Sequence, residues 1–155
     1  MDNAPDPDAK VLFRIPRNDG TEDFDVETLW ARALGDDRFK LDNCPFFAYS
    51  VSWQDVVHAP FDEAEGFPTF RDVIEKSGNR TIRLVVNPCD GDEHSTNILS
   101  ALVRLGCSSE GANSRYVVIN IPSAIDFGVV VRFLIEAKAK FEYADPTYAE
   151  LFPGR

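Results

Sequence analysis

Hydrophobic and polar residues alternate along much of residues 10–86, as they do in strands that bury one face. Runs of this kind cover residues 10–16, 26–34, 38–41, 55–59, 69–76 and 81–86. Turn-forming residues separate several of them, including Gly35-Asp36-Asp37 and Ser77-Gly78-Asn79. We expect strands in these runs, and a short helix is the alternative for residues 26–34.

The stretch from Leu41 to Val57, LDNCPFFAYSVSWQDVV, is the densest signal in the chain and places four aromatic residues within eight positions. Pro45 excludes a helix at that point. The pattern predicts a strand, a bend at Pro45, and a second strand that ends at Val51. Aromatic residues at this density favour a place in the core, and a ligand pocket beside Asp42 and Asn43 is the alternative.

Beyond residue 87 the hydrophobic period lengthens to about 3.6 residues, which is typical of amphipathic helices. The first predicted helix begins at Asp92 or Glu93 and ends at Leu105, before Gly106. A nearly unbroken apolar strand at residues 116–121 follows. Ser123 and Asp126 then predict a capping box for a second helix. An extended piece at residues 141–144 precedes Pro146.

Together these elements predict an α+β fold with two halves. Residues 10–80 are expected to form a bent antiparallel sheet or small barrel. It packs on a C-terminal ferredoxin-like βαββαβ half, residues 81–145, whose second strand is the short piece at residues 107–110. Residues 1–9 are polar and acidic and predict a disordered leader. Residues 146–155 are expected to be a tail.

The composition of the chain, and above all its net charge, indicates which kinds of partner it can bind. The chain has 155 residues, of which 44% are hydrophobic, and this is enough for a sizeable core. The formal net charge is −10, and the acidic excess is spread along the chain. Such a field repels phosphate backbones and anionic lipids, so we expect neither a nucleic acid nor a membrane partner. It attracts basic proteins and cations, and the alternative is that it serves solubility.

Cysteine usage and the ends of the chain bear on location. The three cysteines, Cys44, Cys89 and Cys107, form no CxxC pair, so neither a disulfide framework nor a zinc site is indicated. The N-terminal residues lack the pattern of an export signal, and no apolar run is long enough to span a membrane. We therefore expect a cytoplasmic protein with buried structural thiols.

Residues 90–94, DGDEH, gather carboxylates and an imidazole, but their spacing is not that of a calcium loop. Acidic residues gather at the start of a helix, and this is the preferred explanation of the cluster. Cys89 lies five residues before His94, which suits an activated thiol, yet no third residue orients the pair. His58, in an apolar strand, is expected to be satisfied by hydrogen bonds. We therefore predict no catalytic residue, no metal and no cofactor.

Several strings along the chain carry a resemblance to a known family. They are VLFRIP, ETLWA followed by LG, LDNCPFFAYSVSWQDVV, SGNRTIR, and LGC at the end of the first helix. Together they resemble a bacterial family catalogued as domain of unknown function 4265, over about residues 10–145. The resemblance implies no established activity, ligand or catalytic residue.

The loop at residues 61–68 combines acidic and aromatic residues on a segment too polar to be wholly buried. Aromatic anchors ringed by charge suit a surface that binds a basic partner, and a solvated loop is the alternative. The residues predicted to contact such a partner are Trp53, Asp55, Asp62, Glu63, Glu65 and Phe67.

Three functions from different classes follow. The first is a small acidic protein-binding module, in its sharpest form an immunity protein or antitoxin that occludes a basic toxin. The second is a small-ligand sensor or carrier with Tyr49 and Trp53 at an aromatic pocket between the two halves. The third is an enzyme that uses Cys89 with His94, or a metal at Asp90, Asp92 and His94. The first is the prediction, and the other two are alternatives.

Overall fold

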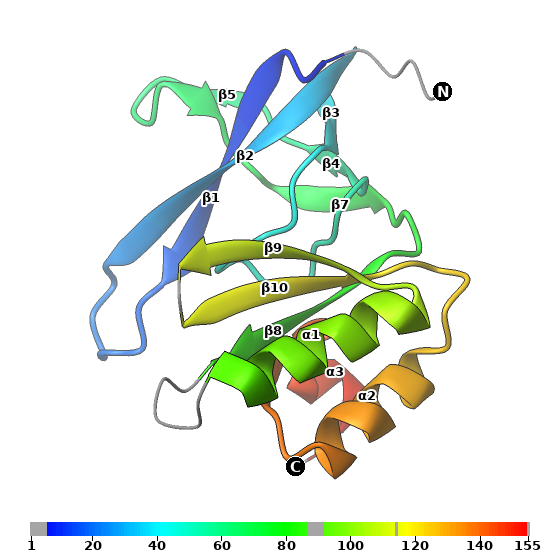
Figure 1. Cartoon of the computed structure of the whole chain (residues 1–155). Helices are drawn as coiled ribbons and strands as arrows, with labels where there is room; N and C mark the ends of the chain where they lie inside the picture. The colour runs from blue at the N-terminus through cyan, green and yellow to red at the C-terminus, as the bar shows by residue number, and fades with distance from the viewer. Residues whose placement is uncertain (1–5, 87–91, 114, 155) are drawn as a thin grey trace.

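The computed structural model describes residues 6–86, 92–113 and 115–154, and it has the predicted α+β class (Figure 1). The strands of the first half are β1 (Ala9–Pro16), β2 (Phe24–Gly35), β3 (Arg38–Leu41), β4 (Val56–His58), β5 (Phe61–Asp62), β6 (Phe67–Pro68) and β7 (Asp72–Glu75). The second half contains β8 (Arg80–Val85), α1 (Asp92–Leu105), β9 (Ser108–Asn113), β10 (Tyr116–Ile121), α2 (Phe127–Glu136), β11 (Lys140–Asp145) and α3 (Tyr148–Leu151).

The first half is an antiparallel sheet in the order β1-β2-β3-β4-β7, with β5 and β6 as a separate hairpin. The sheet bends so far that the residues after β6 return to β1. There Leu12 and Thr69 form a parallel bridge, and the Phe70 N–H donates to the Leu12 carbonyl at 2.9 Å. Alternation along β1 and β2 buries one face of the sheet around Val11, Phe13 and Leu29.

The second half is an antiparallel sheet in the order β11-β8-β10-β9, covered on one face by α1 and α2 (Figure 1). Apolar side chains from the sheet and both helices fill the space between them, among them Ile82, Leu102, Ile119, Val130 and Leu134. Asp126 caps α2, since its carboxylate accepts from the N–H groups of Gly128 and Val129. The predicted start at Ser123 was therefore three residues early.

The predicted strands on either side of Pro45 are wrong, because residues 42–55 contain no strand. We call these residues the junction segment. The Glu27 carboxylate accepts from the N–H groups of Phe46, Phe47 and Ala48 at 2.6, 3.2 and 3.0 Å, so a side chain replaces the neighbouring strand. In Figure 1 the junction segment descends from the five-stranded sheet toward the four-stranded one.

Both predicted ends of the chain differ from expectation where the structure describes them. Residues 1–5 of the predicted leader lie outside the described residues. The Asp8 N–H donates to the Ala31 carbonyl, and its carboxylate accepts from the Ala33 N–H, so β2 holds the chain from Asp8 onward. The predicted tail contains α3, whose Thr147 and Glu150 form a capping box. None of the described helices combines the length and apolar character needed to cross a membrane.

Candidate ligand-binding site

The junction segment joins the two halves through polar contacts. The Ser77 hydroxyl and the Asn79 amide both donate to the Trp53 carbonyl, at 2.7 and 3.0 Å. The Ser50 N–H donates to the Ala144 carbonyl in β11 at 2.8 Å. LDNCPFFAYSVSWQDVV and SGNRTIR, two of the strings that carry the family resemblance, therefore meet at one place in the fold.

A cluster of polar side chains centred on Lys76 reinforces this contact. The ammonium group lies 2.7 Å from Asp55 and 2.6 Å from Asp145, and the Ser52 hydroxyl also donates to Asp145. Burial alone would lower the pKa of Lys76, but its hydrogen bonds to Asp145 and Asp55 outweigh that effect and raise the pKa. Asp55 is fully buried. Its carboxylate also accepts from the N–H groups of Ser52 and Ser77, at 2.9 and 2.8 Å.

An open groove of about 510 Å³ lies between the junction segment and the end of the chain. Its lining residues are Tyr49, Phe141, Glu142, Tyr143, Thr147, Tyr148 and Ala149. Small-molecule sites have volumes of roughly 300–1,000 Å³ and mostly apolar walls with a few fixed polar groups. Tyr49 and Tyr148 are about half exposed, at 49% and 52%, so both rings are accessible to a ligand.

Three donors fix the carboxylate of Glu142 in the wall of this groove. One oxygen accepts from Arg83 Nε at 2.7 Å and from the Tyr116 hydroxyl at 2.8 Å, and the other accepts from the Tyr49 hydroxyl at 2.9 Å. Burial raises the pKa of Glu142, but the two tyrosine hydrogen bonds and the Arg83 charge together lower it below its usual range. Glu142 is therefore ionised at neutral pH.

Arg83 supports the groove from behind and is itself inaccessible to solvent. Its guanidinium lies over the Tyr49 ring at 4.5 Å and donates to the Ala48 carbonyl at 2.9 Å. Its Nη2 atom has no hydrogen-bond partner among the described residues. Arg83 thus sets the position of both Tyr49, from the junction segment, and Glu142, from β11.

The predicted partner-binding loop lies at the β5–β6 hairpin, and its carboxylates are partly engaged. Arg14 Nη2 forms ion pairs with Asp62 at 3.2 Å and with Glu65 at 3.0 Å. Glu63 is exposed and Phe67 is half-buried. Trp53 and Asp55 belong to the junction segment instead, where Trp53 Nε1 donates weakly to Asp42 at 3.4 Å. The binding of a partner by these six residues stays a prediction.

The residues considered for chemistry are buried, paired or outside the described residues. Cys44 and Cys107 are buried, and burial raises the pKa of both thiols, that of Cys44 to about 12. Cys89 and Asp90 lie outside the described residues, as do the side chains of Asp92 and Glu93. His58 lies 3.4 Å from Asp72. Among the described residues no three His, Cys, Asp or Glu side chains gather as a metal site.

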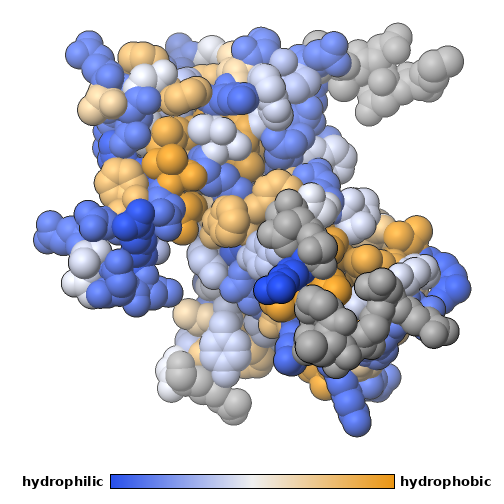
Figure 2. Space-filling view, turned by 60° about the vertical axis from the view of Figure 1, so that its left-hand side comes forward, coloured by the Kyte–Doolittle hydropathy of each residue, from blue (hydrophilic) through white to orange (hydrophobic). Residues whose placement is uncertain are grey.

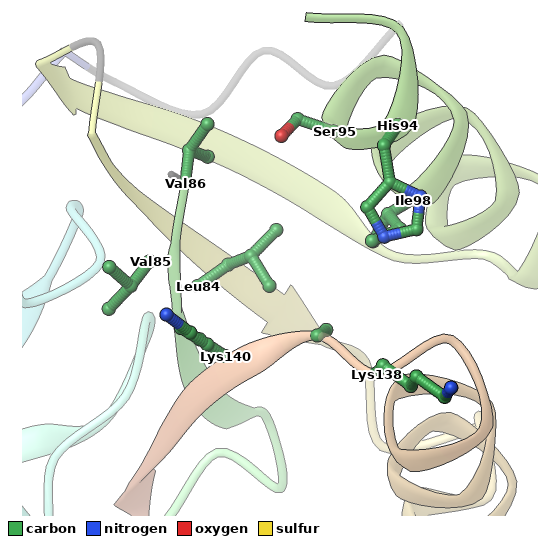
Figure 3. Close-up of a pocket in the computed structure, with 9 residues that line it drawn as sticks. Leu84, Val85, Val86, His94, Ser95, Ile98, Lys138 and Lys140 are labelled. Atoms are coloured by element: carbon green, nitrogen blue, oxygen red, sulfur yellow. The ribbon is translucent and has the colours of Figure 1, made fainter. Parts of the chain in front are cut away.

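His94 lies beside a small pocket between α1, β8 and the start of β11 (Figure 3). Its imidazole points toward the loop that carries Lys138, while Ser95 points toward Val86 (Figure 3). The pocket has a volume of about 20 Å³, which suits roughly one water molecule. It is too small for an organic ligand.

Sequence reasoning named Tyr49 but missed Arg83, Glu142 and Tyr148. One signal for Arg83 was present, because an arginine inside the apolar run TIRLVV requires a buried partner. Nothing in the sequence indicated that this partner would come from β11.

Both the sequence and the fold of this chain are similar to those of other proteins. A family model described as Domain of unknown function (DUF4265) matches residues 27–143. A crystal structure of a hypothetical protein from Neisseria gonorrhoeae has a similar fold, with a TM-score of 0.74 and 19% sequence identity. The match covers 90% of this chain and 96% of that chain. No curated protein matches. Neither the description of the family nor that of the Neisseria gonorrhoeae protein names a reaction or a ligand.

Proposed function

The chain belongs to the family described as Domain of unknown function (DUF4265), and from this premise we propose that it is a carrier or sensor of a small organic ligand. The ligand occupies the groove between the junction segment and β11–α3. The observation that carries the proposal is the fixed Glu142 carboxylate among aromatic side chains in a groove of about 510 Å³.

The groove's construction supports binding more than catalysis. Glu142 is held by three hydrogen bonds and is ionised, so it is a fixed polar contact and not a proton donor at neutral pH. Burial is the main cause that raises the pKa values of Tyr49 and Tyr143, so both hydroxyls stay protonated. A rigid polar group set among apolar walls orients a ligand.

Thermal-shift and ligand-observed NMR measurements test the proposal with a metabolite panel divided into cations, neutral aromatics and anions. We expect at least one class to bind saturably to the wild type and to lose its binding to Tyr148→Ala. Phe61→Ala is the matched control, because Phe61 is exposed to 62% on the β5–β6 hairpin and does not line the groove. Absence of binding across the panel, or equal binding to Tyr148→Ala, would refute the proposal.

A second candidate is the predicted protein-binding module with a basic partner, in the sharpest form a cytoplasmic immunity protein or antitoxin. It is favoured by hydrophobic side chains exposed along one face of β2, namely Phe24, Val26, Trp30 and Leu34, at 42–53%. Hydrophobic side chains also appear on the surface of the upper half of the molecule in Figure 2. Exposed apolar side chains on an acidic body suit such a partner.

Purification at low salt from the native host tests this second candidate. The expected result is a stoichiometric basic partner that dissociates as the salt concentration rises and that binds Trp30→Ala more weakly. Recovery of the chain alone at low salt would contradict it.

The ferredoxin-like character of the second half is also a proposal. It is supported by the order β11-β8-β10-β9, by the antiparallel pairing of neighbours and by the strand-helix-strand-strand-helix-strand connection.

A further inference from the structure

We infer that the ligand of the groove is a small organic cation with an alkylated ammonium group, an inference that rests on the proposed binding function. Three features of the described residues lead to this class: the charge of the groove, the arrangement of its rings and the occupancy of its hydrogen-bond acceptors.

The charge around the groove favours a cation. Glu142 is the charged member of the lining residues, and none of them is a lysine or arginine. Glu150, on the adjacent helix α3, adds a second carboxylate, whose pKa is lowered chiefly by the hydrogen bond from Ser50. Arg83 balances Glu142, but it is buried behind the Tyr49 ring. The positive charge of Lys76 acts on Glu150 in the same way. The ring faces and the net charge of −10 therefore determine the sign of the preference.

The aromatic side chains of the groove pack against one another at steep angles and do not form a flat stack, with ring centroids 5.3 Å apart for Phe141 and Tyr143 and 6.2 Å apart for Tyr143 and Tyr148. The ring planes of Phe141 and Tyr143 meet at 81°, and those of Tyr143 and Tyr148 at 44°. Rings at such angles turn their electron-rich faces in different directions. A cation near the centroids of such rings is attracted by the ring quadrupoles, with the larger energies where water is excluded. Tyr49 already makes one such contact, since Arg83 lies over its ring at 4.5 Å.

The Glu142 carboxylate in the groove wall already accepts three hydrogen bonds, which favours an alkylated ammonium over a primary one. Glu142 accepts from Arg83, Tyr116 and Tyr49. One oxygen of Glu150 accepts from Ser50 and from Thr147. A primary ammonium carries three N–H donors that need partners when they leave water. A trimethylammonium group has none, and its methyl groups can contact the rings directly.

Choline and its uncharged carbon isostere, 3,3-dimethylbutan-1-ol, form a matched pair of probes, with ethanolamine as the primary amine. Isothermal titration at low salt should show choline binding about tenfold tighter than the isostere, the factor that corresponds to a cation–π energy of intermediate size. Ethanolamine should bind more weakly than choline. Tyr148→Leu should remove the preference for choline, because leucine keeps apolar contact but has no ring.

Control variants separate this effect from a loss of folding. Tyr148→Phe keeps the ring and should retain the preference, and Phe61→Leu should behave as the wild type; circular dichroism confirms that each is folded. Equal or tighter binding of the isostere would overturn the inference but not the proposed function. Saturable binding of only a neutral or anionic panel member would have the same consequence. If neither the probes nor any panel member binds, both this inference and the proposed function are refuted.

Discussion

Glu142 and Arg83 form an unequal pair, since the Arg83 side chain is inaccessible while that of Glu142 is 39% exposed. Removing the carboxylate leaves a buried guanidinium without its counter-charge, whereas removing the guanidinium leaves a carboxylate that water can reach. Loss of one partner of a buried pair is costly because the remaining charge stays desolvated. The groove wall therefore depends more on keeping Glu142 than its partial exposure suggests.

Glu142→Gln tests this at the level of one residue. Because the folded pKa of Glu142 lies below its ordinary value of 4.5, the carboxylate contributes stability above pH 4.5 that is lost as the pH falls through the folded pKa. The variant should be less stable at pH 7, by about 1–3 kcal/mol because of the partial exposure. Its stability should also fall less between pH 5 and 3 in urea titrations. Glu136→Gln, at an exposed site on α2, is the control, and parallel pH profiles for the wild type and Glu142→Gln would contradict the prediction.

Gly78 is a second residue whose identity the fold requires. Its φ is +94°, and an added Cβ would lie 2.8 Å from the Cβ of Ser123, which cannot move away without its backbone. Gly35 has a similar φ of +87° but open space around it. Both alanine variants carry the left-handed backbone penalty of about 1–2 kcal/mol, and Gly78→Ala adds the collision. Chemical denaturation should find Gly78→Ala the less stable; equal losses would show that the collision relaxes freely.

At the scale of elements, alternation and helical periodicity located most of the fold. The predicted runs at residues 10–16, 38–41 and 116–121 coincide with β1, β3 and β10, and the helix predicted to end at Leu105 is α1. In β3 the buried residues alternate, and α1 packs one face on the sheet, so the sequence period predicts both elements. β10 is buried on both faces, and its unbroken apolar run predicts it instead.

The junction segment could not be predicted in this way, because its backbone is held by side chains from elsewhere. Glu27 accepts three N–H groups of the segment, and Ser50 and Gln54 have φ values of +66° and +69° that interrupt any alternation. The groove could not be predicted from the sequence either. It requires Tyr49 to meet Glu142, 93 positions later in the chain, and no local pattern reports such a contact.

Glu27→Gln should therefore loosen the junction segment selectively. A glutamine offers a single acceptor oxygen, so N–H groups at Phe46, Phe47 and Ala48 lose partners in a largely buried place. Each unpaired buried donor costs about 1–3 kcal/mol, and relaxation of the segment limits the total. Amide hydrogen exchange should speed up at residues 46–48 more than in β1 or β10. Glu22→Gln, at an exposed position, is the control. Unchanged exchange at residues 46–48 would show that Glu27 does not hold the segment.

At the scale of the whole molecule, two hydrophobic cores are joined by polar contacts. We call these contacts, made by the junction segment with Lys76, β8 and β11, the polar seam. One core lies within the five-stranded sheet, and the other lies between the four-stranded sheet and its helices. The face of β8 turned toward the junction segment carries Thr81 and Arg83, both fully buried. Hydrogen-bond geometry therefore sets the position of one half relative to the other, and the groove between them depends on it.

Lys76 is the test of that seam, because its ammonium group joins Asp55 from the first half to Asp145 from the second. Lys76→Met leaves two buried carboxylates facing each other without a cation, which should cost about 3 kcal/mol, the low end for a broken buried pair, because the Lys76 side chain is 45% exposed. The unfolding transition should broaden and its denaturant slope should fall, as the halves no longer unfold together. Adding Asp55→Asn removes one of the facing charges, so the double variant should be more stable than Lys76→Met alone. A single sharp transition in Lys76→Met, with the wild-type slope, would show that the cores are coupled through other contacts.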